Sequence, residues 1–364
     1  DIMDTRERMK IYEELTSLSG IAGYEKAVRN YLKERLAKCS DEIIQDRLGS
    51  VFGIKYGPAD GPIVMIAGHM DEVGAIVVNI TPKGFIKMQP IGGINPEVFL
   101  SQNMQIDIGN GKFIQGVIGA TPPHSSRGLD EDNRKLSFDD LLLDIGADSK
   151  EHAQQLGVKI GQQITPVNNY FITADGKKIV AKAWDNRFGC GMALEIMEAV
   201  KDLELPFTLV AGATVQEEVG LRGATTASQM IEPDLFIALD VSPAGDFLDD
   251  KHPASFGALG QGFLVRFYDP RCIMHNGLRQ YFYELATKNN IKHQNFLSMG
   301  GTDAAAAQYA KHGTLSTTIG LPGRYIHSTA AMIHIDDVEA VKQMLMAILQ
   351  DFNQDVFERI KNNV

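Results

Sequence analysis

The spacing of hydrophobic residues changes twice along the 364-residue chain, and this double change limits the possible folds more than any other feature. Residues 1–73 and 168–364 hold apolar strands that alternate with amphipathic helices, whereas residues 74–167 hold short alternating runs separated by Pro-Lys-Gly and Asn-Gly turns. The first pattern is typical of an α/β sheet, and the second is typical of an antiparallel β-barrel or sandwich. We therefore predict one α/β domain over residues 1–73 and 168–364, with a small β-barrel domain over residues 74–167 inserted into it.

The α/β part of the chain predicts both helices and strands from its periodicity. Helices are predicted over 4–18, 24–38, 187–201, 275–289, 303–311 and 336–361. Strands are predicted over 50–56, 62–69, 179–184, 207–215, 235–241, 263–268 and 314–320. This alternation predicts a mixed, mostly parallel sheet with helices on both faces.

The composition of the chain indicates which kinds of binding partner and which cellular setting to expect. Hydrophobic residues make up 44% of the chain, enough for a proper core, and 46 acidic against 35 basic residues give a net charge of -11. Nucleic-acid-binding proteins favour basic patches, so we expect no nucleic-acid partner. No stretch reaches the length of apolar sequence that spans a membrane. The three cysteines, Cys39, Cys190 and Cys272, lie far apart without a CxxC motif, and we expect a reduced, cytoplasmic protein.

Histidines and carboxylates follow several of the predicted strands, at the end where α/β proteins place their sites. The residues concerned are His69 with Asp71, Asp185, the pair Glu217 and Glu218, Asp240, and His327. Any one of them is more simply a cap, a turn residue or a solvated side chain. Five strand ends that all carry such groups, each after an apolar strand, instead predict that they gather on one rim of the sheet.

The mixture of ligand types indicates which metal would bind. Two histidines with three carboxylates suit Zn²⁺, Co²⁺ or Mn²⁺ better than Ca²⁺ or Mg²⁺. One carboxylate can bridge two ions, which leaves a histidine and a carboxylate for each. Of Glu217 and Glu218, one would bind metal and the other would act as general base. Asp71 lies two residues after His69 and can orient the imidazole ring.

The loop of Gly300, Gly301, Thr302 and Asp303 has two interpretations. It is a tight turn capped by Thr302 or Asp303, or it is a loop whose backbone approaches a substrate. Motifs of other chemistries do not occur: the chain has no GxxxxGK[ST], no GxGxxG that opens a helix after a strand, no HExxH and no GxSxG.

Six longer motifs, in order along nearly the whole chain, resemble the tetrahedral (TET-type) dinuclear metallo-aminopeptidases, and within them the glutamyl aminopeptidase branch. They are GHMDEVG at 68–74, AWDNRFGCG at 183–191, QEEVGLRGA at 216–224, ALDVSPAGD at 238–246, GGTDA at 300–304 and RYIHS at 324–328. The resemblance implies a zinc-exopeptidase-like fold. It also implies that residues 74–167 mediate dimers, which build a tetrahedral dodecamer.

The resemblance also implies a role for each site residue. His69 and Asp240 would hold one metal ion, Glu218 and His327 the other, and Asp185 would bridge the two. Glu217 would be the general base for a water bound between the ions, and a non-proline cis peptide is expected after Asp185. The implied activity is removal of N-terminal residues from peptides, with two divalent ions as cofactors, Zn or Co, and Mn as an alternative.

A preference for glutamyl or aspartyl N-termini requires a cation in the first substrate pocket. Arg266, Arg271 and Arg324 are the candidates, although each could simply pair with a nearby carboxylate. Gly300, Gly301 and Thr302 are candidates for backbone contact with the substrate.

Other functions remain open at this point. One is an aminopeptidase of broad or neutral preference, and another is a related two-metal carboxypeptidase or deacylase. A glycosidase of the endoglucanase type would need two carboxylates but no metal, which would leave His69 and His327 without a role. A non-catalytic scaffold would not need the complete ligand set.

Overall fold

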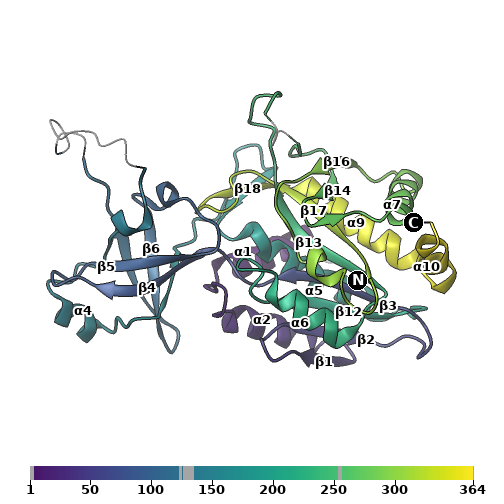
Figure 1. The fold of residues 1–364 in the computed structure, drawn as a ribbon, viewed down its shortest axis with the longest axis horizontal. Helices are drawn as coiled ribbons and strands as arrows, with labels where there is room; N and C mark the ends of the chain where they lie inside the picture. The colour runs from purple at the N-terminus through teal and green to yellow at the C-terminus, as the bar shows by residue number, and fades with distance from the viewer. Residues whose placement is uncertain (1–3, 123–124, 126–134, 253–255, 364) are drawn as a thin grey trace.

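The computed structural model describes residues 4–122, 125, 135–252 and 256–363. These residues form a large α/β part and a smaller β-barrel that stands to one side of it (Figure 1). In the described residues no helix combines the length and the apolar character needed to cross a membrane.

A nine-stranded sheet forms the centre of the α/β part. Along the sheet the strands follow the order β1-β2-β12-β3-β13-β17-β14-β15, and β16 pairs with β14. β12, β3, β13 and β17 are mutually parallel neighbours, whereas β2 and β14 run antiparallel to their neighbours β12 and β17. The strands are β1 (Glu42–Gln45), β2 (Val51–Lys55), β3 (Ile63–His69), β12 (Thr208–Thr214), β13 (Leu235–Pro243), β14 (Phe263–Asp269), β15 (Cys272–Ile273), β16 (His293–Leu297) and β17 (Leu315–Gly323). This confirms the mixed, mostly parallel sheet.

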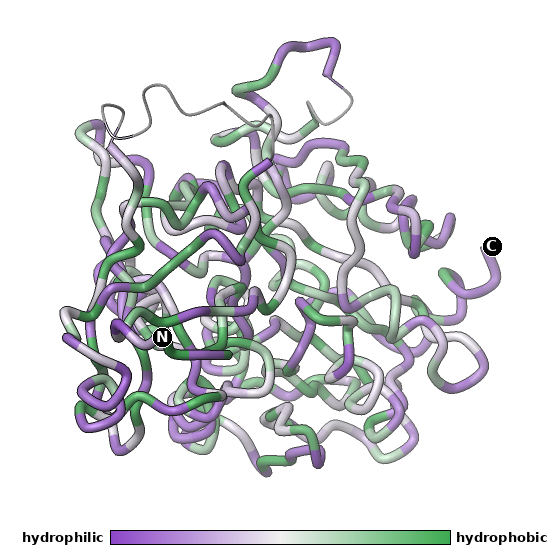
Figure 2. The backbone as a smooth tube through the Cα atoms, turned by 60° about the vertical axis from the view of Figure 1, so that its left-hand side comes forward, coloured by the Kyte–Doolittle hydropathy of each residue, from purple (hydrophilic) through white to green (hydrophobic). Residues whose placement is uncertain are grey.

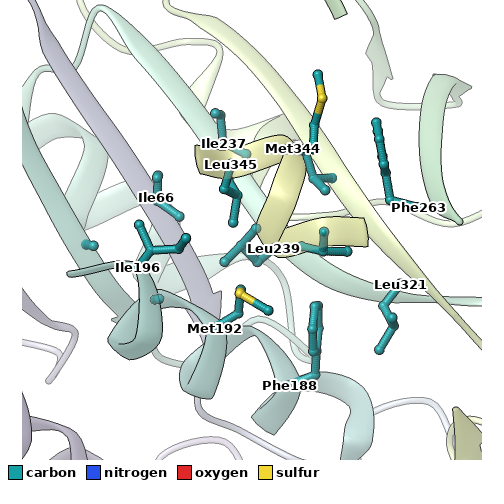
Figure 3. Packing of buried hydrophobic residues seen from close by; sticks show 14 of the residues in the cluster. Ile66, Phe188, Met192, Ile196, Ile237, Leu239, Phe263, Leu321, Met344 and Leu345 are labelled. Carbon is teal, nitrogen blue, oxygen red and sulfur yellow. The ribbon is translucent and has the colours of Figure 1, made fainter. Parts of the chain in front are cut away.

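Helices cover both faces of this sheet. Along β3, Val64 and Ile66 belong to the core that includes residues of α5 and α9, whereas Met65 and Ala67 belong to the core under α6 and α8. This alternation follows from the two-residue period of a strand. Figure 3 shows the first core, in which side chains of the sheet pack against α5 and α9. The helices are α1 (Thr5–Ser17), α2 (Lys26–Leu36), α5 (Trp184–Val200), α6 (Arg222–Ile231), α7 (Asn276–Lys288), α8 (Ala304–Ala307), α9 (Ile335–Asp351) and α10 (Gln354–Lys361).

The inserted segment forms a closed barrel with its own hydrophobic core. Its strands follow the order β4-β5-β8-β7-β6-β9, and all of the pairings are antiparallel. The core contains residues such as Val77, Met88, Phe99, Ile106 and Ile164. The elements are β4 (Gly74–Ile80), β5 (Ile86–Ile91), η1 (Pro96–Phe99), β6 (Asn103–Gly109), β7 (Lys112–Ile118), η2 (Phe138–Asp140), β8 (Leu143–Asp144), α4 (Lys150–Leu156) and β9 (Gln163–Pro166). The predicted barrel is confirmed.

Hydrophobic and hydrophilic residues alternate along the tube of Figure 2, as expected for elements with one buried and one exposed face.

Three local predictions were wrong. The predicted strand 179–184 does not join the main sheet: β11 (Lys178–Ala181) pairs with β10 (Phe171–Ile172) and β18 (Ala331–His334) in a separate small sheet. The predicted helix 336–361 is two helices, because Phe352 is extended and the Asn353 side chain accepts the amide of Val356 to begin α10. The predicted helix 303–311 is reduced to the four residues of α8.

Candidate active site

Two strands of the parallel group, together with the segment that follows a third, carry ligand-type side chains to the same edge of the sheet. His69 is the last residue of β3, and Asp240 lies in β13 beside it. Glu217 and Glu218 follow β12, the other neighbour of β3. Because these strands are parallel, their carboxyl ends meet at this edge and bring the four side chains together.

Asp185 reaches the site by a different route from the one predicted. It does not end a strand of the main sheet but lies in the first turn of α5, where Asp185 and Asn186 have non-helical backbone angles. The peptide bond between them is cis, as the resemblance implied. Asn186 donates its side-chain amide to the Leu239 carbonyl and accepts the amide of Gly189, which anchors this turn against β13 and α5.

His327 lies in the loop after β17 and is held by the inserted barrel. Its Nδ1 is 2.6 Å from the carbonyl oxygen of Gly93, a residue between β5 and η1. A carbonyl can only accept, so Nδ1 carries the proton and donates it there. The other ring nitrogen, Nε2, is left to face the carboxylates of the site.

The four carboxylates lie within ion-pair distance of one or both histidines. His69 Nε2 is 3.0 Å from Asp185 Oδ1, 3.3 Å from Glu217 Oε2 and 3.6 Å from Asp240 Oδ1. On the other side, His327 Nε2 is 2.9 Å from Asp185 Oδ2 and 3.3 Å from Glu218 Oε2. Asp185 therefore lies between the two histidines and presents one oxygen to each.

Asp71 supports both His69 and the turn that carries Glu217 and Glu218. It is fully buried, and its two oxygens accept the amides of Glu217 at 3.0 Å and Glu218 at 2.9 Å. His69 Nδ1 is 3.0 Å from the Asp71 carbonyl oxygen and 3.3 Å from its carboxylate. The ring is thus oriented with Nε2 toward the site. Both the carbonyl oxygen and the carboxylate of Asp71 contribute to this orientation, and the carbonyl oxygen is the closer of the two.

Burial and repulsion raise the pKa values of three carboxyl groups. At Glu218 burial and then Asp185 raise the pKa to about 8, and the same two causes raise the pKa of Asp240 to about 6. Burial also raises the pKa of Glu217 well above its ordinary value. At His327 burial lowers the pKa, but hydrogen bonds with Asp185 and Glu218 outweigh it and raise the pKa to about 12. So many carboxyl groups in one buried place are unfavourable unless positive charge compensates them.

The donor set fits a pair of divalent metal ions. In the residues that the structure describes, three groups each bring their ligand atoms within 4.8 Å of one another: His69 with Asp185 and Asp240, Asp185 with Glu218 and His327, and His69 with Glu217 and Glu218. The first two groups share Asp185. Among the described residues, the buried Oε1 of Glu218 has no hydrogen-bond partner, which is the situation of an oxygen that a cation would satisfy.

A cavity of about 570 Å³ opens beside these ligands. Asp185, Glu217, Glu218, Asp240 and His327 lie on one wall. Much of the remaining wall is apolar or backbone, and it is formed by Leu221, Val241, Pro243, Phe296, Leu297, Met299, Gly300, Gly301, Thr302 and Ile326. The loop at 300–302 therefore borders the space that a substrate would occupy.

The three candidate arginines differ in their surroundings. Arg266 lines the cavity but is buried, and it donates to Asp269, Ser242 and the Gly300 carbonyl. Arg324 forms a two-bond ion pair with Asp246 and is not among the residues that line the cavity. Arg271 lines the cavity, is exposed, and within the described part of the chain its guanidinium has no ion pair or hydrogen bond.

Two buried carboxyl groups near the site were missed by sequence reasoning. Asp303 was considered only as a cap, but Thr302 accepts the Ala304 amide instead, and Asp303 Oδ2 accepts the Thr214 hydroxyl at 2.6 Å. Glu25 accepts the amide of Gln216, and burial raises its pKa to about 7. Glu25 precedes a helix rather than following a strand, so no strand-end signal could have identified it.

Comparison with known proteins places this arrangement in a family. The sequence profile of the M42 glutamyl aminopeptidases matches residues 49–344. The glutamyl aminopeptidase of Lactococcus lactis subsp. cremoris is 40% identical over 349 residues, which cover 96% of this chain and 97% of the relative. The lysyl aminopeptidase of Pyrococcus furiosus is 31% identical, over 94% of this chain and 96% of the relative.

Solved structures agree with the sequence comparison. A TET aminopeptidase from a marine sediment archaeon of the Thaumarchaeota matches with a TM-score of 0.92 at 32% identity, over 97% of this chain and 99% of that chain. The TET1 peptidase of Pyrococcus horikoshii, which can assemble into a tetrahedron or a large octahedral shell, matches with a TM-score of 0.84 at 29% identity, over 95% and 100% of the two chains.

Fold and sequence together define a peptide-bond hydrolase. The chain belongs to the M42 glutamyl aminopeptidase family, and it is an aminopeptidase. The resemblance of the six motifs is thereby confirmed. Peptidases of this family depend on metal ions, in agreement with the ligand groups described above.

Proposed function

We propose that the protein removes N-terminal residues from peptides with two divalent metal ions and Glu217 as the general base. His69 and Asp240 would hold one ion, Glu218 and His327 the other, and Asp185 both. The observation that supports this most is the position of Asp185, whose two oxygens face one histidine each. The donor set suits Zn²⁺ or Co²⁺, and Mn²⁺ fits the same ligands.

Each protein group has a defined task in this reaction. When bound, two divalent ions lower the pKa of a water molecule and polarise the scissile carbonyl. Glu217 accepts the proton of the attacking water and returns it to the leaving amine. Asp71 holds the backbone of Glu217 in place. The burial that raises the pKa of the Glu217 carboxyl also strengthens it as a proton acceptor in this site.

The Glu217→Gln variant tests the general base. Because the amide cannot take a proton, we expect kcat to fall by about 100-fold or more, while both metal ions remain bound. Activity is measured with aminoacyl-nitroanilides and metal content by mass spectrometry, in the reconstituted protein. Near wild-type turnover in Glu217→Gln would show that another group is the base. Full activity in chelator-treated protein would show that the metal ions are not required.

We also propose a preference for acidic N-termini, with Arg271 as the cation that meets the substrate carboxylate. Its guanidinium borders the cavity without a partner among the described residues, whereas Arg266 and Arg324 are engaged. The apolar side chains of Phe296, Leu297 and Ile326 in the same wall favour a second candidate, a broad or neutral preference.

The Arg271→Ala variant separates these two specificities. Losing a charged hydrogen bond typically costs about 1.5–3 kcal/mol, so we expect kcat/KM for glutamyl-nitroanilide to fall by roughly tenfold or more. The value for leucyl-nitroanilide should change little. Arg324→Ala is the matched control, because that arginine pairs with Asp246 outside the cavity. Equal losses on both substrates in Arg271→Ala would favour the neutral specificity.

The remaining alternatives gain no support from the site. A carboxypeptidase or deacylase would share the ligands but not the family, and an endoglucanase would leave His69 and His327 without a task.

We further propose that the inserted barrel, residues 74–167, mediates dimers that assemble into a tetrahedral dodecamer, and that residues 1–73 and 168–364 form the catalytic domain. A cytoplasmic setting is supported by Cys39, Cys190 and Cys272, all of which are free thiols.

A further inference from the structure

The turn that carries Glu217 and Glu218 is held by two buried carboxylates from different parts of the chain. Asp71 accepts the amides of Glu217 and Glu218, at 3.0 and 2.9 Å. Glu25 accepts the amide of Gln216 at 2.8 Å, across 191 positions of sequence. Three consecutive backbone amides are therefore directed at two carboxylates, and only one of these belongs to the strand-end motifs.

The position of Glu25 in its own helix does not account for its burial. Glu25 is the N-cap residue of α2, where an acidic side chain commonly accepts an amide of its own helix, but it makes no such bond. Its side chain is instead directed to Gln216 and is only 3% exposed. Burying a carboxylate is costly unless hydrogen bonds compensate, and the bond from the Gln216 amide is one that compensates this burial.

Gln216 has a backbone conformation that residues with a side chain rarely adopt. Its φ is 54°, in the left-handed region, a strained conformation that surrounding contacts must offset. Its side-chain oxygen accepts a hydrogen bond from Arg222, and its amide is held by Glu25. The conformation of this residue sets the direction in which the chain continues to Glu217.

We propose that Glu25 is a positioning residue for the reaction: by holding the Gln216 amide, it fixes the backbone from which Glu217 reaches the attacking water. This inference rests on the proposed role of Glu217 as general base. Glu25 is not among the residues that line the cavity or that form the candidate ligand groups. It supplies one hydrogen bond of the correct reach, and misplacement of a catalytic group by about 1 Å can cost 100-fold in rate.

Three substitutions of Glu25 separate the effect of side-chain length from the effect of charge. Glu25→Gln keeps the length of the side chain and one carbonyl acceptor but removes the charge. Glu25→Asp keeps the charge but is shorter by one methylene, and Glu25→Ala removes the acceptor. We expect kcat to fall by about 10–100-fold in the Ala and Asp variants with KM changed little, and to recover to within about threefold of wild type in Glu25→Gln. Metal content should equal that of wild type in all three.

Glu195→Ala is the matched control, because Glu195 is a buried carboxylate that pairs with Arg8 and Lys342 away from the turn. It should lower the free energy of unfolding, measured by urea titration, and leave kcat of the folded enzyme near wild type. Wild-type kcat in Glu25→Ala would overturn the proposal. It would also be overturned by a Glu25→Asp enzyme faster than Glu25→Gln, or by a kcat loss that matches a loss of metal.

Glu217→Gln, assayed in parallel, distinguishes the positioning role of Glu25 from the proposed role of Glu217 as general base. If Glu217→Gln is inactive and Glu25→Ala has wild-type kcat, the positioning role fails and the general base stands. If Glu217→Gln is active, the proposed base fails, and the positioning role fails with it.

Discussion

At the scale of single residues, Arg187 joins several segments of the chain beneath the active site. It is fully buried, and it donates to the carboxylate of Glu72 at 2.8 Å, while Lys182 donates to the same carboxylate. Its other bonds go to the backbone carbonyl oxygens of Leu15, Leu18, Gly20 and Met70. One guanidinium thus links the N-terminal segment to the residue that follows His69.

The Arg187→Met variant should therefore lose much of the stability of the fold. Removing one partner of a buried ion pair typically costs about 3–5 kcal/mol, because the remaining charge and carbonyl groups are left without compensation. The free energy of unfolding, measured by urea titration, should fall by that order. Lys361→Met, at the exposed pair with Glu358, is the control and should change it little. Equal stability of both variants would contradict this account.

Among the elements, the close approach of β3 to α5 positions His69 most directly. At Gly68, a Cβ would lie 2.3 Å from the carbonyl carbon of Gly189 and 2.6 Å from the amide nitrogen of Cys190. Both are backbone atoms, which cannot move aside as the end of a side chain can. The strand and the helix therefore touch through their backbones one residue before His69.

Gly68→Ala should separate these two elements. Overpacking of a core typically costs about 1–3 kcal/mol, and the strand can relieve the clash only by shifting His69 with it. We expect a lower free energy of unfolding and a weaker affinity for metal, measured by calorimetric titration of the stripped protein. Gly119→Ala, where a Cβ would meet no atom within 4 Å, is the control. Unchanged metal affinity in Gly68→Ala would count against the contact.

Sequence patterns identified the helices and strands that have a strong hydrophobic periodicity. They missed the elements that form because of contacts with other parts of the fold. The barrel and the strands that carry His69 and Asp240 were predicted from alternation and apolar runs. α6, with the sequence RGATTASQMI, was not predicted, because its threonines and its few apolar residues give a weak helical signal, and it forms against α8 and β12. Asp185 was predicted as a metal ligand, but the position of the strand that precedes it was not. This strand, β11, belongs to a separate small sheet.

Contacts between a side chain and a backbone group far apart in sequence account for what could not be predicted at the site. The bond of Glu25 to Gln216 and that of Gly93 to His327 each span about half of the chain or more. Neither leaves a local pattern, because a glutamate before a helix and a glycine in a loop are common in any protein. His69 and Asp240 were accessible to sequence reasoning because the ends of parallel strands bring such side chains to one edge of a sheet.

For the whole molecule, the barrel exposes apolar side chains that a single chain leaves uncovered. Phe113 and Val117 are 42% and 40% exposed on β7, and Ile160 in the same domain is 63% exposed. Phe113 and Val117 lie four residues apart on β7 and therefore share a face, and contiguous apolar patches of this kind commonly mark surfaces that contact another protein. This is consistent with the proposal that the barrel mediates assembly.

We therefore expect an assembly of about twelve chains of 39.9 kDa in solution. Light scattering coupled to size exclusion measures its mass. The double change Phe113→Glu and Val117→Glu should lower that mass without unfolding the chain, because charges are costly in a buried interface. Met230→Glu on α6, also at an exposed apolar residue, is the control. A monomeric wild-type protein would contradict the proposed assembly.

Because His327 donates a hydrogen bond to Gly93, the α/β part of this enzyme depends on the inserted barrel for the orientation of one histidine. Excision of residues 74–167 would remove the carbonyl that selects the tautomer of His327, so that the imidazole could present either nitrogen to an incoming ion. A trimmed version would then be expected to keep the sheet and four of the five proposed ligands, yet to bind an ion more weakly at the position of His327. The insertion in this sense orients a residue of the proposed ion site, and a short linker could not replace it.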